Sequence, residues 1–84
     1  MPPITIYTTS LCPYCAMAKR LLQQKGAAFH EIAVGAKPAL REHMHVKSGR
    51  HTVPQIWIGD AHVGGCDDLY ALDADGKLDP LLAG

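Results

Sequence analysis

The first part of the chain alternates between strand and helix patterns, and this alternation restricts the fold more than any other feature. Residues Ile4–Thr8 are rich in β-branched side chains and end in polar turn residues, as a short strand does. Residues 13–25 carry apolar side chains at helical spacing, with Pro13 in the first turn and Gly26 just past the end. A second strand is predicted over Ala28–Val34. Two strands joined by a helical crossover run parallel, so the sheet must contain a parallel pair.

The remainder of the chain adds further helix patterns and a hairpin. Gly59-Asp60 separates two short β-rich runs, which is a signal for a two-residue hairpin turn. The predicted elements after the second strand are a helix over 38–47 stopped at Ser48-Gly49, strands over 55–58 and 61–63, a helix over 66–72 and a short helical turn over 78–82. The order β-α-β-α-β-β-α therefore predicts an α/β fold in which helices flank a four-stranded mixed sheet.

Length and composition limit the kinds of molecule that this chain is expected to bind. The 84 residues predict a single domain over 1–84. Lys plus Arg and Asp plus Glu number 8 each and form no basic stripe, so neither nucleic acid nor a membrane is expected as a partner. The N-terminus lacks the charged and apolar regions of a secretory signal, and no apolar run approaches the roughly 18 residues of a membrane-spanning helix. We therefore expect a cytoplasmic protein whose three cysteines serve catalysis or metal binding rather than structural disulfides.

Cys12-Pro13-Tyr14-Cys15 lies at the predicted junction between the first strand and the first helix. Two thiols at this spacing can exchange between dithiol and disulfide, and the N–H groups and dipole at a helix start favour the thiolate of the first cysteine. Cys15, one turn further into the helix, would face apolar surroundings and stay protonated. The pattern therefore predicts that Cys12 attacks a disulfide and that Cys15 resolves the product.

A structural zinc clip is an alternative interpretation of this motif, because C-x-x-C also occurs in metal-binding loops. The sequence has no second C-x-x-C motif. In addition, His43-Met44-His45 lacks the gap of about three to five residues found in the usual histidine pairs. We therefore predict no metal site.

Two further blocks, together with the cysteine motif, carry a resemblance to a known family. They are Thr52-Val53-Pro54 and Gly64-Gly65-Cys66-Asp67-Asp68. The spacing between the three blocks matches as well, so the similarity extends over nearly the whole chain. In these blocks the chain resembles the glutaredoxins, close to the short bacterial dithiol type. The Pro-Tyr pair between the thiols is similar to glutaredoxins, whereas thioredoxins carry Gly-Pro. The resemblance implies a thioredoxin-like fold and a glutathione-dependent thiol–disulfide oxidoreductase.

The resemblance implies that the second block is a ledge for glutathione. A cis bond between Val53 and Pro54 would face the thiols and leave the backbone of Val53 free to pair with an extended peptide. Glutathione, a short peptide with a central cysteine, would fit such a ledge. Pro54 could also be an ordinary proline at the start of a strand, and Thr52 could simply cap a turn.

The third block is a candidate site for the γ-glutamyl end of glutathione. Gly65 would let the ligand approach the backbone, and the N–H of Cys66 at a helix start would meet a carboxylate, while the Cys66 side chain serves as an apolar filler. Asp67 would accept from the ligand ammonium, whereas Asp68 is predicted to be an ordinary acid of the first helical turn. The predicted glutathione-binding residues are Tyr14, Thr52, Val53, Pro54, Gly65, Cys66 and Asp67, and for Tyr14 packing on the helix is an equal alternative.

Thr9 departs from the pattern of the family. Many glutaredoxins carry a lysine at this place, where it helps to stabilise the thiolate and attracts a carboxylate of glutathione. Thr9 is a weaker donor, and Arg50 or Lys19 could take over part of this role. Among the five histidines, only His51 beside Thr52 lies near a candidate site.

The resemblance also implies cofactors and partners. Glutathione would be a co-substrate without any tightly bound cofactor, and a separate glutathione reductase would regenerate it. Disulfide-containing or glutathionylated proteins would be the substrates of a monomer, with ribonucleotide reductase as a candidate. Two rival functions stay open here. One is an iron–sulfur carrier that uses Cys12 and glutathione, which Pro13 disfavours, and the other is a thioredoxin-type enzyme served directly by a flavin reductase.

Overall fold

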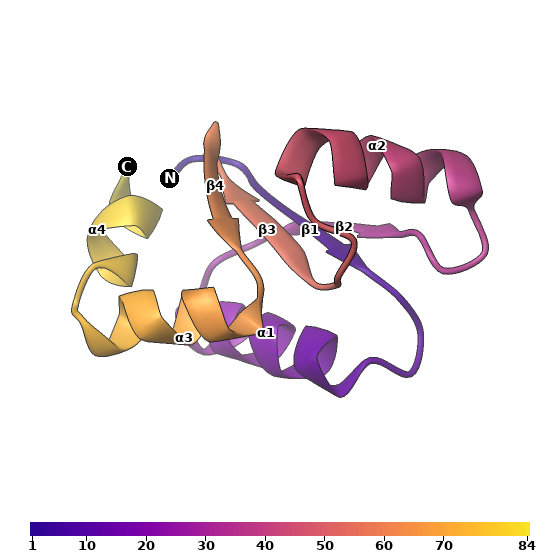
Figure 1. The fold of residues 1–84 in the computed structure, drawn as a ribbon. Coiled ribbons are helices and arrows are strands. Elements are labelled where there is room, and N and C mark those ends of the chain that lie inside the picture. Colours follow the sequence, from indigo (N-terminus) through magenta and orange to yellow (C-terminus); the bar gives the residue numbers. More distant parts are fainter.

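A four-stranded sheet with the strand order β2-β1-β3-β4 forms the centre of the computed structural model, which describes all residues from Met1 to Gly84. Helices cover both faces of this sheet (Figure 1). The elements in chain order are β1 (Ile4–Thr8), α1 (Pro13–Gln24), β2 (His30–Ala33), α2 (Pro38–Ser48), β3 (Gln55–Ile58), β4 (Ala61–Gly64), α3 (Cys66–Ala74) and α4 (Leu78–Ala83). The mixed sheet and the order of its elements confirm the predicted α/β architecture.

β1 lies in the interior of the sheet and sets its mixed character. It pairs parallel with β2, where Thr5 faces His30, and antiparallel with β3, where Tyr7 faces Gln55. β3 and β4 form the predicted hairpin, and Gly59 in its turn has a φ of +60°, which glycine adopts without strain. Because β1 and β3 run in opposite directions, the end of β1 and the start of β3 lie side by side.

Side chains that alternate along the strands build two apolar cores, one on each face of the sheet. Ile6 and Ile56 point to the face covered by α1, α3 and α4, whereas Tyr7 and Trp57 point to the face covered by α2 (Figure 1). The larger core consists of Ile4, Ile6, Ala18, Leu21, Leu22, Ala27, Ile56, Ile58, Cys66, Leu69, Leu78 and Leu82, with Phe29 packed at its margin. The smaller core consists of Tyr7, Val34, Met44 and Trp57. The prediction that Trp57 is a core residue is therefore confirmed.

The N-terminal end of α1 differs from the sequence pattern in one respect. The apolar spacing of residues 13–25 places Tyr14 on the same face as Ala18, yet Tyr14 is 59% exposed, and Cys15 takes the inward position at 1% exposure. Successive residues of a helix are rotated by about 100°, so only one of these two neighbours can point at the sheet. The choice of Cys15 leaves the ring of Tyr14 outside the core.

β2 is shorter than the sequence pattern predicts, since it covers His30–Ala33 rather than residues 28–34. Thr5 already faces His30 and β1 begins at Ile4, so residues 28 and 29 have almost no strand to pair with. α2 and α3 extend slightly beyond their predicted ends. None of the helices is long and apolar enough to cross a lipid bilayer.

Candidate active site

Cys12 and Cys15 lie where β1 finishes and β3 begins, and both thiols are free. Cys12 is the N-cap of α1, and its Sγ accepts the backbone N–H of Cys15 at 3.2 Å. Cys12 is partly exposed, with its Sγ 4.0 Å from the carbonyl oxygen of Val53, whereas Cys15 is almost fully buried. The turn into α1 thus presents one thiol outward and the other inward, which is the geometry that the predicted roles require.

Burial keeps Cys15 protonated. Burial, followed by the hydrogen bond with Cys12, raises the pKa of the Cys15 thiol to about 12. A backbone hydrogen bond at Thr9 and the charge of Lys19 act in the opposite direction. At neutral pH Cys15 is therefore a thiol. The third thiol, Cys66, is buried in the larger core, and burial raises its pKa as well, which fits an apolar filler.

A cavity of about 270 Å³ gathers every residue that the sequence predicts to bind glutathione. This ledge cavity is lined by Tyr14, Arg50, Thr52, Val53, Pro54, Gly65, Cys66, Asp67 and Asp68. It borders Cys12 through Val53, and the Val53–Pro54 peptide bond is cis, as the resemblance implies. Three segments that are far apart in the sequence therefore form one site: the start of α1, the residues before β3 and the start of α3.

Gln55 supports the residues of the ledge from the interior, a role that the sequence pattern did not reveal. Its side chain is fully buried, and its Nε2 donates to the carbonyl oxygen of Thr52 at 3.0 Å and to Oγ1 of Thr52 at 3.2 Å. Its Oε1 accepts from Nε2 of His62 at 2.8 Å, and burial lowers the pKa of His62, which favours the neutral ring. A buried amide without partners would cost about 1–3 kcal/mol, so these bonds hold Thr52 in place.

Asp68 connects the start of α3 with Arg50. Its Oδ2 accepts from the backbone N–H of Gly65 at 2.9 Å and from Nη1 of Arg50 at 2.9 Å. The hydrogen bond from Arg50, followed by that from Gly65, lowers the pKa of the Asp68 carboxyl. Asp68 therefore caps α3, as expected of an acid in the first turn, and it holds the guanidinium of Arg50 at the rim of the ledge cavity.

Gly64 has no room for a side chain. Its φ is +112°, a conformation that residues with a Cβ rarely adopt. A Cβ at this position would collide with the carboxylate of Asp68 and lie 2.9 Å from Nη1 of Arg50. A side chain at residue 64 would therefore have to displace the side chains of Asp68 and Arg50.

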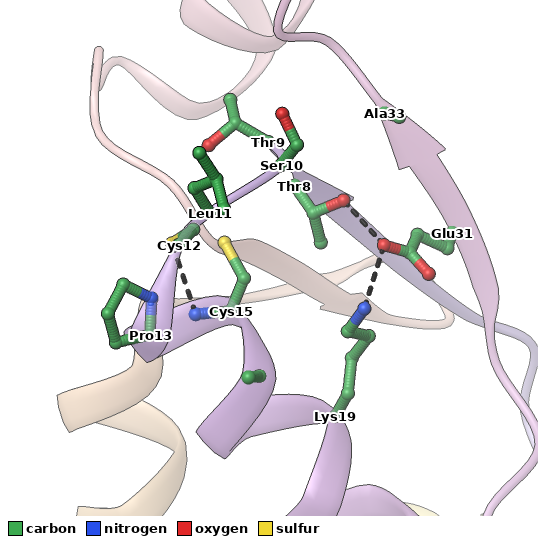
Figure 2. Close-up of a pocket in the computed structure, with 11 residues that line it drawn as sticks. Thr8, Thr9, Ser10, Leu11, Cys12, Pro13, Cys15, Lys19, Glu31 and Ala33 are labelled. Carbon is green, nitrogen blue, oxygen red and sulfur yellow. Dashed lines mark hydrogen bonds and ion pairs between the residues drawn. The ribbon is translucent and has the colours of Figure 1, made fainter.

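A second cavity, of about 610 Å³, lies on the other side of the thiols. This thiol cavity is lined by Thr8, Thr9, Ser10, Leu11, Cys12, Pro13, Cys15, Ala16, Lys19, Glu31 and Ala33. Figure 2 shows the two thiols at one end and the side chains of Lys19 and Glu31 facing each other at the other. Leu11, directly before Cys12, has a φ of +56° and a fully exposed side chain.

Most of the remaining candidate residues line one of the two cavities. Thr9, at the place of the family's lysine, lines the thiol cavity together with Lys19, whereas Arg50 lines the ledge cavity. Tyr14 is exposed and lines the ledge cavity, so its ring does not pack into the core. His51 lines neither cavity, and its ring stacks on that of His45 with 3.6 Å between the centroids. No group of three or more His, Cys, Asp and Glu side chains is close enough together to hold a metal ion.

Comparison with known proteins agrees with this geometry. The model of the family described as Glutaredoxin matches residues 4–63. The chain belongs to the glutaredoxin family. A glutaredoxin from Pseudomonas aeruginosa is 63% identical over 83 residues, which cover 99% of both chains. Glutaredoxin 3 from Escherichia coli is 57% identical over 82 residues, which cover 98% of this chain and 99% of the relative.

Solved glutaredoxin structures share the fold. The crystal structure of a buckwheat glutaredoxin–glutathione complex superposes with a TM-score of 0.91 at 33% identity, covering 98% of this chain and 77% of the other. The solution structure of glutaredoxin from Brucella melitensis has a TM-score of 0.87 at 61% identity, covering 98% and 89%. The thioredoxin-like fold is thereby confirmed. Like its family, this glutaredoxin is a glutathione-dependent thiol–disulfide oxidoreductase.

Substitution of Gly64 should destabilise the fold more than substitution of a glycine at a helix end. Gly64→Ala combines a strained backbone with a collision and should cost about 3 kcal/mol or more. Gly49→Ala, where φ is +73° and no atom lies within 4 Å of the added Cβ, should cost about 1 kcal/mol. Urea unfolding of both variants checks this, and equal losses would contradict the crowding at residue 64.

Replacement of Asp68 by asparagine should destabilise the protein in a pH-dependent way. The pKa of Asp68 is lowered in the folded state, so its carboxylate stabilises the fold above the ordinary range of Asp, about pH 4. That contribution fades as the pH falls through this range towards the folded-state pKa. The difference in melting temperature between wild type and Asp68→Asn should therefore be larger at pH 7 than at about pH 3. A difference independent of pH would argue against the carboxylate as its source.

Proposed function

We propose that this glutaredoxin reduces protein disulfides with both thiols and glutathione mixed disulfides with Cys12 alone. One observation carries the proposal: the partly exposed Cys12 borders the ledge cavity through Val53, whereas Cys15 is buried behind it. A nucleophile must reach the substrate sulfur, while a resolving thiol needs to reach only its neighbour. The two exposures therefore match two different tasks.

Glutathione would occupy the ledge cavity with its sulfur next to Cys12. The backbone of Val53 would pair with the ligand as an added strand, flanked by Tyr14 and Thr52 with Pro54 beneath. At the other end, beside Gly65, the N–H of Cys66 would meet the γ-glutamyl carboxylate and Asp67 its ammonium. Arg50 at the rim would attract the remaining carboxylate and replace part of the role of the missing lysine. The complex of the buckwheat relative with glutathione supports this choice of ligand.

In the dithiol route, the Cys12 thiolate attacks one sulfur of a protein disulfide, and the other sulfur leaves as a thiolate that takes up a proton. Cys15 then loses its proton to water and attacks Sγ of Cys12. A Cys12–Cys15 disulfide forms, the bond to the substrate breaks, and the substrate has gained two electrons. Two glutathione molecules restore the dithiol through a Cys12–glutathione intermediate and leave as glutathione disulfide.

Whether Cys12 is a free thiolate or part of a mixed disulfide would determine when Cys15 attacks. Two of the causes that raise the pKa of Cys15 are the hydrogen bond and the charge of Cys12. In a mixed disulfide Cys12 carries no thiolate, so its charge no longer raises the pKa of Cys15, whereas burial, the largest cause, still does. Cys15 would therefore become a better nucleophile only after the first attack has occurred.

In the monothiol route, the substrate is a glutathionylated protein. The Cys12 thiolate attacks the glutathione sulfur, and the protein sulfur leaves as a thiolate that takes up a proton. A second glutathione, as its thiolate, then attacks the Cys12-bound glutathione and releases glutathione disulfide. No bond to Cys15 forms in this route, so Cys15 is dispensable.

We also propose where this enzyme acts and with which molecules. Residues 1–84 would act as one domain and as a monomer, in a cytoplasm whose reduced glutathione pool drives the cycle. Glutathione would be the co-substrate without a tightly bound cofactor, and glutathione reductase would contribute indirectly by recycling it. Disulfide-containing and glutathionylated proteins would be the substrates, with ribonucleotide reductase as a candidate.

Serine substitutions should separate the two routes. Cys12→Ser should abolish both activities, because no other exposed thiol can begin the attack. Cys15→Ser should retain reduction of a small glutathione mixed disulfide and lose reduction of a protein disulfide. Both rates are measured with glutathione and glutathione reductase, following oxidation of the nicotinamide cofactor. Equal loss of both activities in Cys15→Ser would sink the division of roles.

Restoring the family's lysine should tighten glutathione binding. In Thr9→Lys the added ammonium should lower the KM for a glutathione mixed disulfide about two- to fivefold, the effect of a partly exposed ion pair. Thr9→Gln, which adds length without charge, is the matched control. If the KM of Thr9→Lys equals that of the control, residue 9 does not take the place assigned to it.

A further inference from the structure

A chain of three side chains crosses the thiol cavity at the end away from the ledge cavity. Oγ1 of Thr8, on β1, donates to Oε2 of Glu31, on β2, at 2.6 Å. The same oxygen of Glu31 accepts from Nζ of Lys19, on α1, at 3.1 Å (Figure 2). Thr8 is 2% exposed, so its hydroxyl is a fixed point that belongs to the sheet. The ammonium of Lys19 is thereby paired, at the partly exposed surface, with a carboxylate that is itself hydrogen-bonded to the sheet.

The tethered ammonium lies on the same side of α1 as Cys15. Lys19 follows Cys15 by four residues, which places the two Cβ atoms about 5–6 Å apart, one turn of the helix from each other. Both residues line the thiol cavity. Glu31 is exposed on the strand at the edge of the sheet, and the hydrogen bond from Thr8, followed by that from Lys19, lowers its pKa, which keeps it a carboxylate.

Few other charged or titratable groups act on Cys15. Cys12 faces it from the start of α1, and the segment between β1 and α1 contributes only the uncharged Thr9, Ser10 and Leu11 to the cavity. On α3, the other thiol is Cys66, and the charge of Cys12 is one of the causes that raise its pKa. Once Cys12 is in a mixed disulfide, Lys19 with its partner Glu31 is the charged pair that remains beside the resolving thiol in this cavity.

We propose that Lys19, tethered by Glu31 and Thr8, is a positioning residue for the resolving step, where its ammonium favours the thiolate of Cys15. This inference rests on the dithiol route proposed above. In that step the proton of Cys15 goes to water in the open cavity, and Sγ of Cys15 attacks Sγ of Cys12. The Cys12–Cys15 bond forms as the bond from Cys12 to the substrate sulfur breaks. Lys19 neither takes the proton nor touches the substrate, and it acts through Cys15.

The resolving step can be observed alone by mixing the reduced protein with glutathione disulfide. Cys12 becomes glutathionylated, and this intermediate decays to the internal disulfide with release of glutathione. Acid quenching and mass spectrometry follow the decay between about pH 6 and pH 9. In Lys19→Gln the decay should slow about three- to tenfold at neutral pH, and its pH profile should move to higher pH, because the charge that favours the Cys15 thiolate is lost and a tenfold change corresponds to one pKa unit.

Two variants separate a specific charge effect from a general loss of structure. Lys19→Arg keeps the charge and should decay within about twofold of wild type. Lys25→Gln removes another lysine of the same region, one paired with Asp73 at 2.7 Å and Asp79 at 3.0 Å outside both cavities, and should behave as wild type. A wild-type rate and pH profile in Lys19→Gln would overturn the proposal, as would a failure of Lys19→Arg to restore the rate.

The parallel variant Cys15→Ser distinguishes this inference from the function on which it rests. Its glutathionylated form should persist, because no resolving thiol is present. If the wild-type intermediate persists equally long, the dithiol route itself is wrong, and the assignment of Lys19 is wrong with it. If wild type decays quickly and Lys19→Gln decays at the same rate, only the assignment of Lys19 is wrong.

Discussion

The antiparallel pairing of β1 with β3 is the constraint on which the site depends. Because Tyr7 faces Gln55, the chain leaves β1 towards Cys12 at the same edge of the sheet where it arrives at β3 from Val53 and Pro54. The thiols and the ledge are thus brought together by backbone hydrogen bonds between strands, without any direct bond between their side chains. A shift of this register by one residue would turn Ile56 and Trp57 to the wrong faces and separate the site together with the core.

Local sequence rules were sufficient for most of the fold. The alternation in Ile4–Thr8, the glycine in the turn before Asp60 and the proline at the start of α1 each act over a few residues, and the corresponding elements lie where they were predicted. The ledge is a different case. The roles of Val53 and Asp67 came from the resemblance to glutaredoxins, because neither residue has a periodicity or a spacing that indicates a ligand.

What the sequence did not reveal consists of particular side-chain contacts and of the direction in which α1 faces the sheet. Gln55 begins a strand and resembles any polar residue there, yet its amide is buried and joins Thr52 to His62. The contact of Glu31 with Thr8 and Lys19 likewise depends on how β2 lies against β1 and α1. Helical spacing allowed either Tyr14 or Cys15 to face the core, and only the direction of α1 over the sheet decides between them.

The crowding around Gly64 couples residues 50, 64 and 68 through the space that they occupy. The interaction energy of the Arg50–Asp68 pair does not show this coupling. An exposed ion pair such as Arg50–Asp68 contributes only about 0–1 kcal/mol by itself, so Arg50 could change in evolution at little cost. The space that the pair occupies is nevertheless what forbids a side chain at residue 64. Among related sequences, a residue larger than glycine at this position should therefore accompany a movement or a change of Arg50 or Asp68 and a different backbone turn. The coupling is one of volume, and it would be visible as covariation even where a substitution of Arg50 alone is nearly neutral.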